Sequence, residues 1–149
     1  MKVGIADTMF ARVDLGAVAM EELVGVEVER YTVPGFKDLP VACKKLIEEY
    51  NCDIVVAFGW VGKEDIDEVC AHEANLGLIQ AELMTNKHIL KVFFHEKETS
   101  DVNEQKKIAI DRARKHTQNA LDLLKGKEEL SLKAGKGQRQ GYDHAGGIL

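Results

Sequence analysis

Strand-like and helix-like patterns of apolar residues alternate along the chain from Lys2 to about Lys125. The strand-like segments are short apolar or alternating runs, and we place them at residues 2–6, 26–33, 53–58 and 89–94. The segments that follow them favour helices at residues 15–23, 39–50, 67–85 and 102–124. This alternation predicts an α/β fold in which helices cross over between the strands of a mostly parallel four-stranded sheet.

Local signals place the ends of several of these elements. Asp14 and Asp38 are suited to capping the first two helices, and Pro40 is tolerated in the first turn of the second. Residues 26–33 alternate as an edge strand does, whereas residues 53–58 form the continuous apolar run of a central strand. We expect the central strand to end at Gly59.

The third helix carries a stripe of apolar residues at helical spacing, which consists of Val69, Leu76, Ile79 and Leu83. Glu73 falls on the same stripe, so we expect it to point toward the sheet or a subunit contact and to need a hydrogen-bonding partner. Structural hydrogen bonding is the favoured role for Glu73 and for its neighbour His72. Proton transfer is the alternative, since burial would change the pKa of either group.

Three of the predicted strands run into segments that mix Gly or Pro with charged or aromatic residues, at residues 7–14, 34–38 and 59–63. In a parallel sheet such loops gather at the carboxyl edge, where helix N-termini and free backbone groups bind ligands. We therefore expect one composite ligand site. Phe10 and Trp60 lie in these loops, where they either stack on a flat heterocycle or cover a strand end.

The 149 residues fit one domain, in which residues 126–149 form a Gly- and Lys-rich C-terminal segment. This segment holds six of the 13 glycines and is expected to be either a flexible end or a closure over a site. A net charge of -5 argues against nucleic acid and favours a small-molecule partner. No apolar run is long enough for a membrane span. Three cysteines without metal spacing indicate reduced thiols in the core of a cytoplasmic protein.

Two familiar motifs are absent. His72-Glu73 and His95-Glu96 each begin like the zinc-binding motif of a metalloprotease helix, but Leu76 and Thr99 stand where that motif has its second histidine, so no metal ligand is assigned. Weak binding of a divalent ion by carboxylates and substrate oxygens stays open. Residues 135–139 resemble a phosphate-binding loop only in their glycines, since they follow no strand and lack the terminal Lys-Ser or Lys-Thr pair.

Residues 32–45, with the sequence TVPGFKDLPVACKK, resemble the archaeal riboflavin synthases, a family related to the lumazine synthases. The likeness continues in order through residues 7–14, 69–78, 83–89 and 134–141. This resemblance implies a flavodoxin-like three-layer sandwich that assembles into a homopentamer, with active sites between neighbouring subunits. It also implies a transferase that converts two molecules of 6,7-dimethyl-8-ribityllumazine into riboflavin and 5-amino-6-ribitylaminouracil by moving a four-carbon unit. Such a dismutation needs no redox cofactor. The resemblance also implies that magnesium or manganese can stimulate the enzyme, although no motif in this sequence indicates a site for either ion.

The reaction needs walls for two flat rings and a base that removes a proton from a ring methyl group. We expect His95 and Glu96 to carry the proton transfers across an interface, with His72 in reserve. The expected substrate-binding residues are Thr8, Phe10, Ala11, Arg12, Pro34, Gly35, Lys37, Asp38, Gly59, Trp60, Val61 and Gly62.

Two other functions are kept as alternatives. A lumazine synthase would form the ribityllumazine from a pyrimidine and a four-carbon phosphate, but its pattern has Pro-Gly-Ser-Phe-Glu where this chain has Pro34 to Asp38, and it has a histidine that residues 62–69 lack. The second alternative is a non-catalytic flavin or nucleotide carrier on a flavodoxin-like fold. That function would favour phosphate-binding Ser and Thr residues, of which the first loop has only Thr8.

Overall fold

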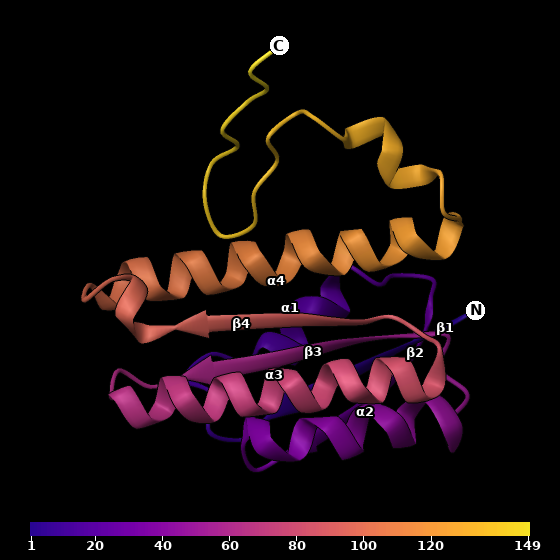
Figure 1. Ribbon diagram of the computed structural model, residues 1–149, viewed down its shortest axis with the longest axis horizontal. Coiled ribbons are helices and arrows are strands. Elements are labelled where there is room, and N and C mark those ends of the chain that lie inside the picture. The colour runs from indigo at the N-terminus through magenta and orange to yellow at the C-terminus, as the bar shows by residue number, and fades with distance from the viewer.

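The computed structural model describes residues 1–149 and has the alternating order of elements that the sequence predicts (Figure 1). The strands are β1 (Lys2–Thr8), β2 (Glu27–Val33), β3 (Ile54–Val61) and β4 (Ile89–His95). The α-helices are α1 (Leu15–Glu21), α2 (Leu39–Glu48), α3 (Asp65–Thr85) and α4 (Val102–Lys125). Short 3₁₀ helices are η1 (Phe36–Asp38), η2 (Glu96–Glu98) and η3 (Glu129–Lys133).

The four strands form one parallel sheet in the order β2-β1-β3-β4. Helices α2 and α3 cover one face and α1 and α4 the other, so two apolar cores lie on either side of the sheet (Figure 1). Every residue of β3 is buried, as expected for a central strand, while β2 alternates at the edge. The predicted three-layer α/β sandwich is thus confirmed. None of the helices combines the length and the apolar character needed to cross a membrane.

Strand β3 is longer than the sequence predicts, because Gly59 does not end it. Gly59, Trp60 and Val61 continue the pairing with β4, opposite Phe93, Phe94 and His95. A Cβ on Gly59 would lie 2.7 Å from the ring of Phe93, so this glycine marks a close approach inside a strand and not a turn. Trp60 and Val61 therefore belong to the sheet, and the prediction that they lie in a loop is wrong.

The two predicted helix caps have different outcomes. The Asp14 carboxylate accepts a 3.0 Å hydrogen bond from the backbone N–H of Ala17, as an N-cap residue should. Asp38 makes no side-chain capping bond. The chain is already helical there, with φ of -91° and ψ of -8°, because η1 leads directly into α2, whereas an N-cap residue normally has an extended backbone.

The apolar stripe on α3 does not face the sheet. Ala71, Ala74, Leu78 and Ala81 make that contact, and the four stripe residues are exposed. Glu73 is exposed on the same outer side, so it does not point toward the sheet, and the alternative of a subunit contact stays a prediction. Small residues let α3 pack closely on the sheet and on α2, which leaves the larger apolar side chains outside.

The C-terminal segment returns along α4 instead of leaving the fold (Figure 1). The backbone N–H of Gly141 donates to the Asp111 carboxylate at 2.9 Å, and Lys115 donates to the backbone carbonyl of Tyr142 at 3.1 Å. Gly141 has φ of +90°, and a Cβ there would lie 2.7 Å from the guanidinium of Arg112. Contact with α4 therefore requires glycine at this position.

Candidate active site

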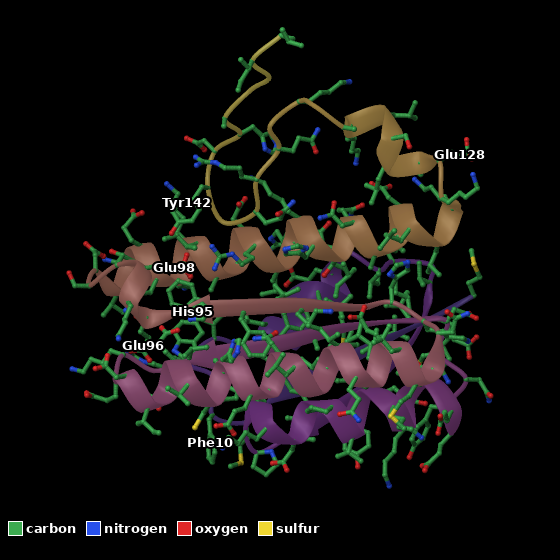
Figure 2. All side chains as sticks on the ribbon, viewed as in Figure 1. Phe10, His95, Glu96, Glu98, Glu128 and Tyr142 are labelled. Carbon is green, nitrogen blue, oxygen red and sulfur yellow. The ribbon has the colours of Figure 1, made fainter.

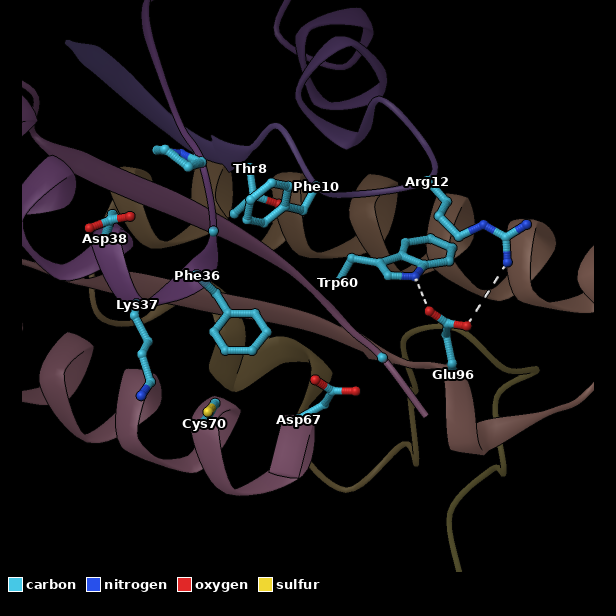
Figure 3. Close-up of a pocket in the computed structure, with 13 residues that line it drawn as sticks. Thr8, Phe10, Arg12, Phe36, Lys37, Asp38, Trp60, Asp67, Cys70 and Glu96 are labelled. Carbon is cyan, nitrogen blue, oxygen red and sulfur yellow. Dashed lines mark hydrogen bonds and ion pairs between the residues drawn. The ribbon is translucent and has the colours of Figure 1, made fainter. Parts of the chain in front are cut away.

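A cavity of about 540 Å³ opens at the carboxyl ends of the strands, where the sequence places the ligand site (Figure 3). This volume lies within the range of about 300–1,000 Å³ that small-molecule sites occupy. The loop after β1, the loop and η1 after β2, the end of β3, the turn after β4 and the first turns of α3 all contribute. The lining residues are Thr8, Phe10, Arg12, Pro34, Gly35, Phe36, Lys37, Asp38, Trp60, Gly62, Asp67, Cys70 and Glu96.

Aromatic rings from three elements form the walls of this cavity. Trp60, on β3, is buried and packs on Phe94 with a centroid separation of 4.7 Å. Phe36, in η1, packs on Phe93 at 5.8 Å. Phe10 is 68% exposed, and its ring lies beside Gly35, where a Cβ would approach it to 3.2 Å. The walls can stack on flat rings, and Phe10 has free surface for doing so.

The Glu96 carboxylate is held between two walls of the cavity (Figure 3). The indole N–H of Trp60 donates to its Oε2 at 2.9 Å, and the guanidinium of Arg12 lies 3.9 Å from its Oε1. Both partners fix the position of the carboxylate. Glu96 therefore presents a fixed, negatively charged acceptor to the N–H and O–H groups of a ligand.

Lys37 carries a positive charge on the opposite rim. Its ammonium lies 3.3 Å from the carboxylate of Glu73, and this contact, with a smaller contribution from Cys70, raises the pKa of Lys37. Lys37 is therefore a cation at neutral pH. Glu73, which sequence analysis considered for proton transfer, is the partner of this ammonium.

The start of α3 closes the cavity beside Gly62. Asp67 accepts a 3.1 Å hydrogen bond from the backbone N–H of Glu64, in a capping box that begins the helix. A Cβ on Gly62 would lie 2.5 Å from the Asp67 carboxylate. Glycine at this position thus allows the carboxylate to approach the backbone at the cavity edge.

Five of the predicted site residues do not line this cavity. Val61 is fully buried in the core on the α2 and α3 side, Gly59 lies within β3, and Ala11 packs against the core on the α1 and α4 side. His72 is exposed on α3. His95 lies next to Glu96 in sequence, but its ring contacts Glu68 on α3 at 2.8 Å.

Sequence analysis missed three of the lining residues. Phe36 lay within a predicted loop, where its neighbours were assigned and it was not. Cys70 was placed in the core together with Cys43 and Cys52, which are buried, but it is half-buried at the cavity. Asp67 stood at the predicted helix start, two residues after the true one, and its position as the third residue after Glu64 was the signal of a capping box.

The cavity residues do not form a ready ligand set for magnesium or manganese. Glu96 and Asp67 are engaged as described, and no group of three or more His, Cys, Asp or Glu side chains gathers in the chain in a way that could hold a metal ion. Divalent magnesium favours several oxygen ligands in octahedral geometry. The residues of this cavity therefore do not fit a resident magnesium or manganese ion.

The fold and the cavity are those of an α/β enzyme that binds a flat small molecule, and comparison with known proteins identifies the family. The family model for 6,7-dimethyl-8-ribityllumazine synthase matches residues 1–128, and the chain therefore belongs to this family. Riboflavin synthase of Methanothermobacter thermautotrophicus is 55% identical to it over 150 residues, which cover 98% of each chain. Riboflavin synthase of Archaeoglobus fulgidus is 48% identical over 152 residues, which cover 100% of this chain and 99% of that one. The resemblance to archaeal riboflavin synthases is thus confirmed.

The similarity to proteins named for the other activity is weaker. The 6,7-dimethyl-8-ribityllumazine synthase of Methanococcus aeolicus is 30% identical over 112 residues, which cover 73% of this chain and 80% of that one. The higher identity and fuller coverage of the riboflavin synthases place this chain among the enzymes of riboflavin biosynthesis.

Proposed function

We propose that this protein is a riboflavin synthase, a transferase that acts on two molecules of 6,7-dimethyl-8-ribityllumazine. A four-carbon unit passes from one molecule to the other. The products, riboflavin and 5-amino-6-ribitylaminouracil, together contain every atom of the two substrates. The exchange involves no net oxidation or reduction, so it needs no redox cofactor, and we expect no organic cofactor to take part.

The cavity suits the physical demands of this reaction. Two flat rings must be held face to face, and such orientation can lower a barrier by roughly 7–11 kcal/mol in favourable cases. Phe10 and Trp60 provide the surfaces for stacking. Thr8, Arg12, Lys37 and Asp38, together with Pro34 and Gly35, which let the backbone approach the ligand, surround these rings and bind the ribityl hydroxyls and ring carbonyls.

The observation that carries the proposal is the carboxylate of Glu96 at an aromatic cavity. The fixed charge between Trp60 and Arg12 can accept hydrogen bonds from the substrate and stabilise positive charge that develops during proton transfer. Lumazine synthase activity would instead require a site for a phosphate group. The position that sequence analysis compared with the serine of the lumazine synthase pattern holds Phe36, whose ring packs on Phe93 and offers no hydrogen bond.

We also propose that the chain assembles into a homopentamer in the cytoplasm, with active sites between neighbouring subunits. Support comes from an exposed apolar face on α3, whose side chains are 42–79% accessible. Exposed apolar residues in one contiguous group commonly mark protein contacts. The apolar face of α3 consists of Ile66, Val69, Leu76, Ile79, Leu83 and Met84.

Sedimentation or light scattering tests the assembly. The chain has a mass of 16.6 kDa, so a pentamer is expected at about 83 kDa. Leu83→Glu places a charge in the apolar face of α3 and should shift the mass toward that of a monomer. Val24→Glu is the matched control, because Val24 is 88% exposed and lies outside this face. A wild-type chain that is monomeric, or a Leu83→Glu chain that keeps the wild-type mass, contradicts the proposed assembly.

A fluorescence assay tests the activity. Purified protein is incubated with 6,7-dimethyl-8-ribityllumazine, and riboflavin is measured by its yellow-green fluorescence, with chelator in one arm and added magnesium or manganese in another. A parallel reaction supplies the pyrimidine and a four-carbon phosphate and measures formation of the lumazine. Riboflavin from the first reaction supports the proposal. Lumazine formation alone indicates the alternative enzyme, and binding without turnover indicates a flavin carrier.

A further inference from the structure

Two carboxylates from different parts of the fold contact His95. Glu68, in the first turns of α3, brings its Oε2 to 2.8 Å from Nδ1 of the imidazole ring. Glu98, in η2 after β4, accepts a 3.0 Å hydrogen bond from the backbone N–H of His95. One contact therefore orients the ring, and the other holds the backbone that carries it.

The Glu68 contact selects one state of the ring. An ionised carboxylate accepts hydrogen bonds and donates none, so we assign the proton to Nδ1, the nitrogen that faces it. With the proton on Nδ1, the neutral ring has its free electron pair on Nε2. The contact thus leaves Nε2 as the nitrogen that can accept a proton from a substrate.

The Glu98 contact is itself firmly held. The guanidinium of Arg112 donates to both oxygens of Glu98 at 2.7 and 2.8 Å, and the hydroxyl of Tyr142 donates to Oε1 at 2.7 Å. Arg112 also donates to the backbone carbonyl of Phe93 at 3.1 Å. Figure 2 shows Tyr142, Glu98 and His95 in succession from the C-terminal segment to the end of β4. The C-terminal segment is thereby connected to the backbone of His95.

The alternative role for Glu68 and His95 is a surface ion pair that contributes little. Exposed pairs of this kind typically contribute little to stability. Here, however, both side chains are only about one-third exposed, at 32% and 33%, and the backbone of the same histidine is anchored separately. The pair also lies at the carboxyl end of β4, where His95 precedes Glu96 in sequence but points to the α3 side, away from the cavity of its own chain.

We propose that Glu68 and Glu98 are positioning residues that prepare His95 to act as the base through Nε2. This inference rests on the proposed function, because the proton concerned is the one that a ring methyl group of the lumazine must lose. His95 Nε2 accepts this proton, and the electron pair of the broken C–H bond passes into the ring system of the lumazine. The imidazolium that results is neutralised by Glu68, and its proton is returned later in the exchange.

Substitution of Glu68 separates a positioning role from a structural one. Glu68→Ala should lower kcat by about 10–100-fold, the size of loss seen when a carboxylate that orients a metal-bound histidine is removed, while KM stays near the wild-type value. Glu68→Gln should retain more of the activity, because the amide oxygen can still accept from Nδ1. Asp65→Asn is the matched control, since Asp65 is a fully exposed carboxylate in the same turn of α3 and pairs only with Lys97. A Glu68→Ala chain with wild-type kcat overturns the proposal.

A second measurement does not depend on turnover. Nitrogen NMR of protein labelled at histidine reports which ring nitrogen carries the proton, and the expected wild-type state of His95 has the proton on Nδ1. His95→Gln identifies the signal, and Glu68→Ala should convert it to a mixture of the two tautomers. A wild-type ring with its proton on Nε2 refutes the positioning by Glu68. Absence of riboflavin synthesis by the wild-type chain, with the Nδ1 tautomer present, refutes the proposed function alone.

Tyr142→Phe tests the contact through Glu98 without removing a charge. It deletes the hydroxyl that donates to Glu98 and leaves the aromatic ring on which Arg112 and Arg139 pack at 5.7 and 5.6 Å. The expected result is a lower kcat with unchanged KM, and a smaller loss than in Glu68→Ala. If the variant matches the wild type in kcat, the C-terminal segment does not position His95.

Discussion

Replacement of Glu98 by Gln should make the free energy of unfolding less dependent on pH in the acid range. The Glu98 side chain is 20% exposed and that of Arg112 13%, so the two form a largely buried ion pair. The substitution keeps the size of the side chain but removes its charge. Arg112 then lacks a charged partner, and loss of one member of a buried pair is strongly destabilising.

The magnitude follows from the pKa of Glu98. Burial acts to raise this pKa, but hydrogen bonds from Arg112, the backbone of His95 and Tyr142 outweigh burial and lower it from 4.5 to about 2. At about 1.36 kcal/mol for each pKa unit, the ionised carboxylate contributes roughly 3 kcal/mol to the free energy of unfolding at neutral pH. We expect Glu98→Gln to lose a similar amount.

The sign of the pH effect is determined by the lowered pKa of the folded state. The contribution of Glu98 is fully present above the unfolded value of 4.5 and is lost as the pH falls toward about 2. In that window the wild-type chain loses this increment of stability, whereas Glu98→Gln has none to lose. The stability curves of the two chains should therefore converge as the pH approaches 2.

Urea unfolding at one protein concentration measures this difference, because assembly makes apparent stability depend on concentration. Glu128→Gln is the control (Figure 2). The Glu128 side chain is 80% exposed and pairs only with its neighbour Lys127, so its loss should change stability by less than about 0.5 kcal/mol. If the deficit of Glu98→Gln is the same at neutral pH as at the acid end of the window, Glu98 is not an ionised anchor and the reasoning fails.

Three further substitutions or modifications test the cavity and its supporting strand. Gly59→Ala places a Cβ 2.7 Å from the ring of Phe93 and should lower the free energy of unfolding in urea by about 1–3 kcal/mol; wild-type stability would show that the strand yields without strain. Trp60→Phe keeps an aromatic wall but removes the N–H that donates to Glu96 at 2.9 Å, so kcat/KM in the riboflavin assay should fall about tenfold or more. An unchanged kcat/KM would show that this contact with Glu96 has no part in the site. Cys70 is the one cysteine that is not buried, so it should react first with a maleimide, and ribityllumazine should slow this reaction in a mass spectrometric time course. Equal rates with and without ribityllumazine would place the ligand elsewhere.

The order of elements could be predicted because the burial of each strand in a parallel sheet determines its pattern of apolar residues. A strand covered on both faces must be apolar at every position, as β3 is, and an edge strand alternates, as β2 does. The end of β3 could not be predicted in this way. Gly59 has the local sequence character of a turn, and only the ring of Phe93 on the neighbouring strand explains why glycine stands there.

The part of the candidate site that lies in loops after strands was predictable for a related reason. The topology of a parallel sheet brings those loops to one edge, so Thr8, Phe10 and Lys37 could be grouped before their side chains were placed. The contribution of α3 depends on the rotation of that helix about its axis, which the apolar stripe appeared to define. Alanines and Leu78 face the core instead, and this rotation brings Cys70 to the cavity and Glu68 to His95.

The alternation of side chains at the end of β4 separates His95 from Glu96. Phe93 packs into the core under α2 and α3, Phe94 into the core under α1 and α4, and His95 returns to the α3 side to meet Glu68. Glu96 then contacts Trp60 on the other side. Adjacent groups that both suit the chemistry therefore point apart, and one cavity of one chain receives only Glu96. If both act on the same pair of lumazines, as the proposed interfacial site requires, His95 of one subunit acts on the substrate held by Glu96 of another.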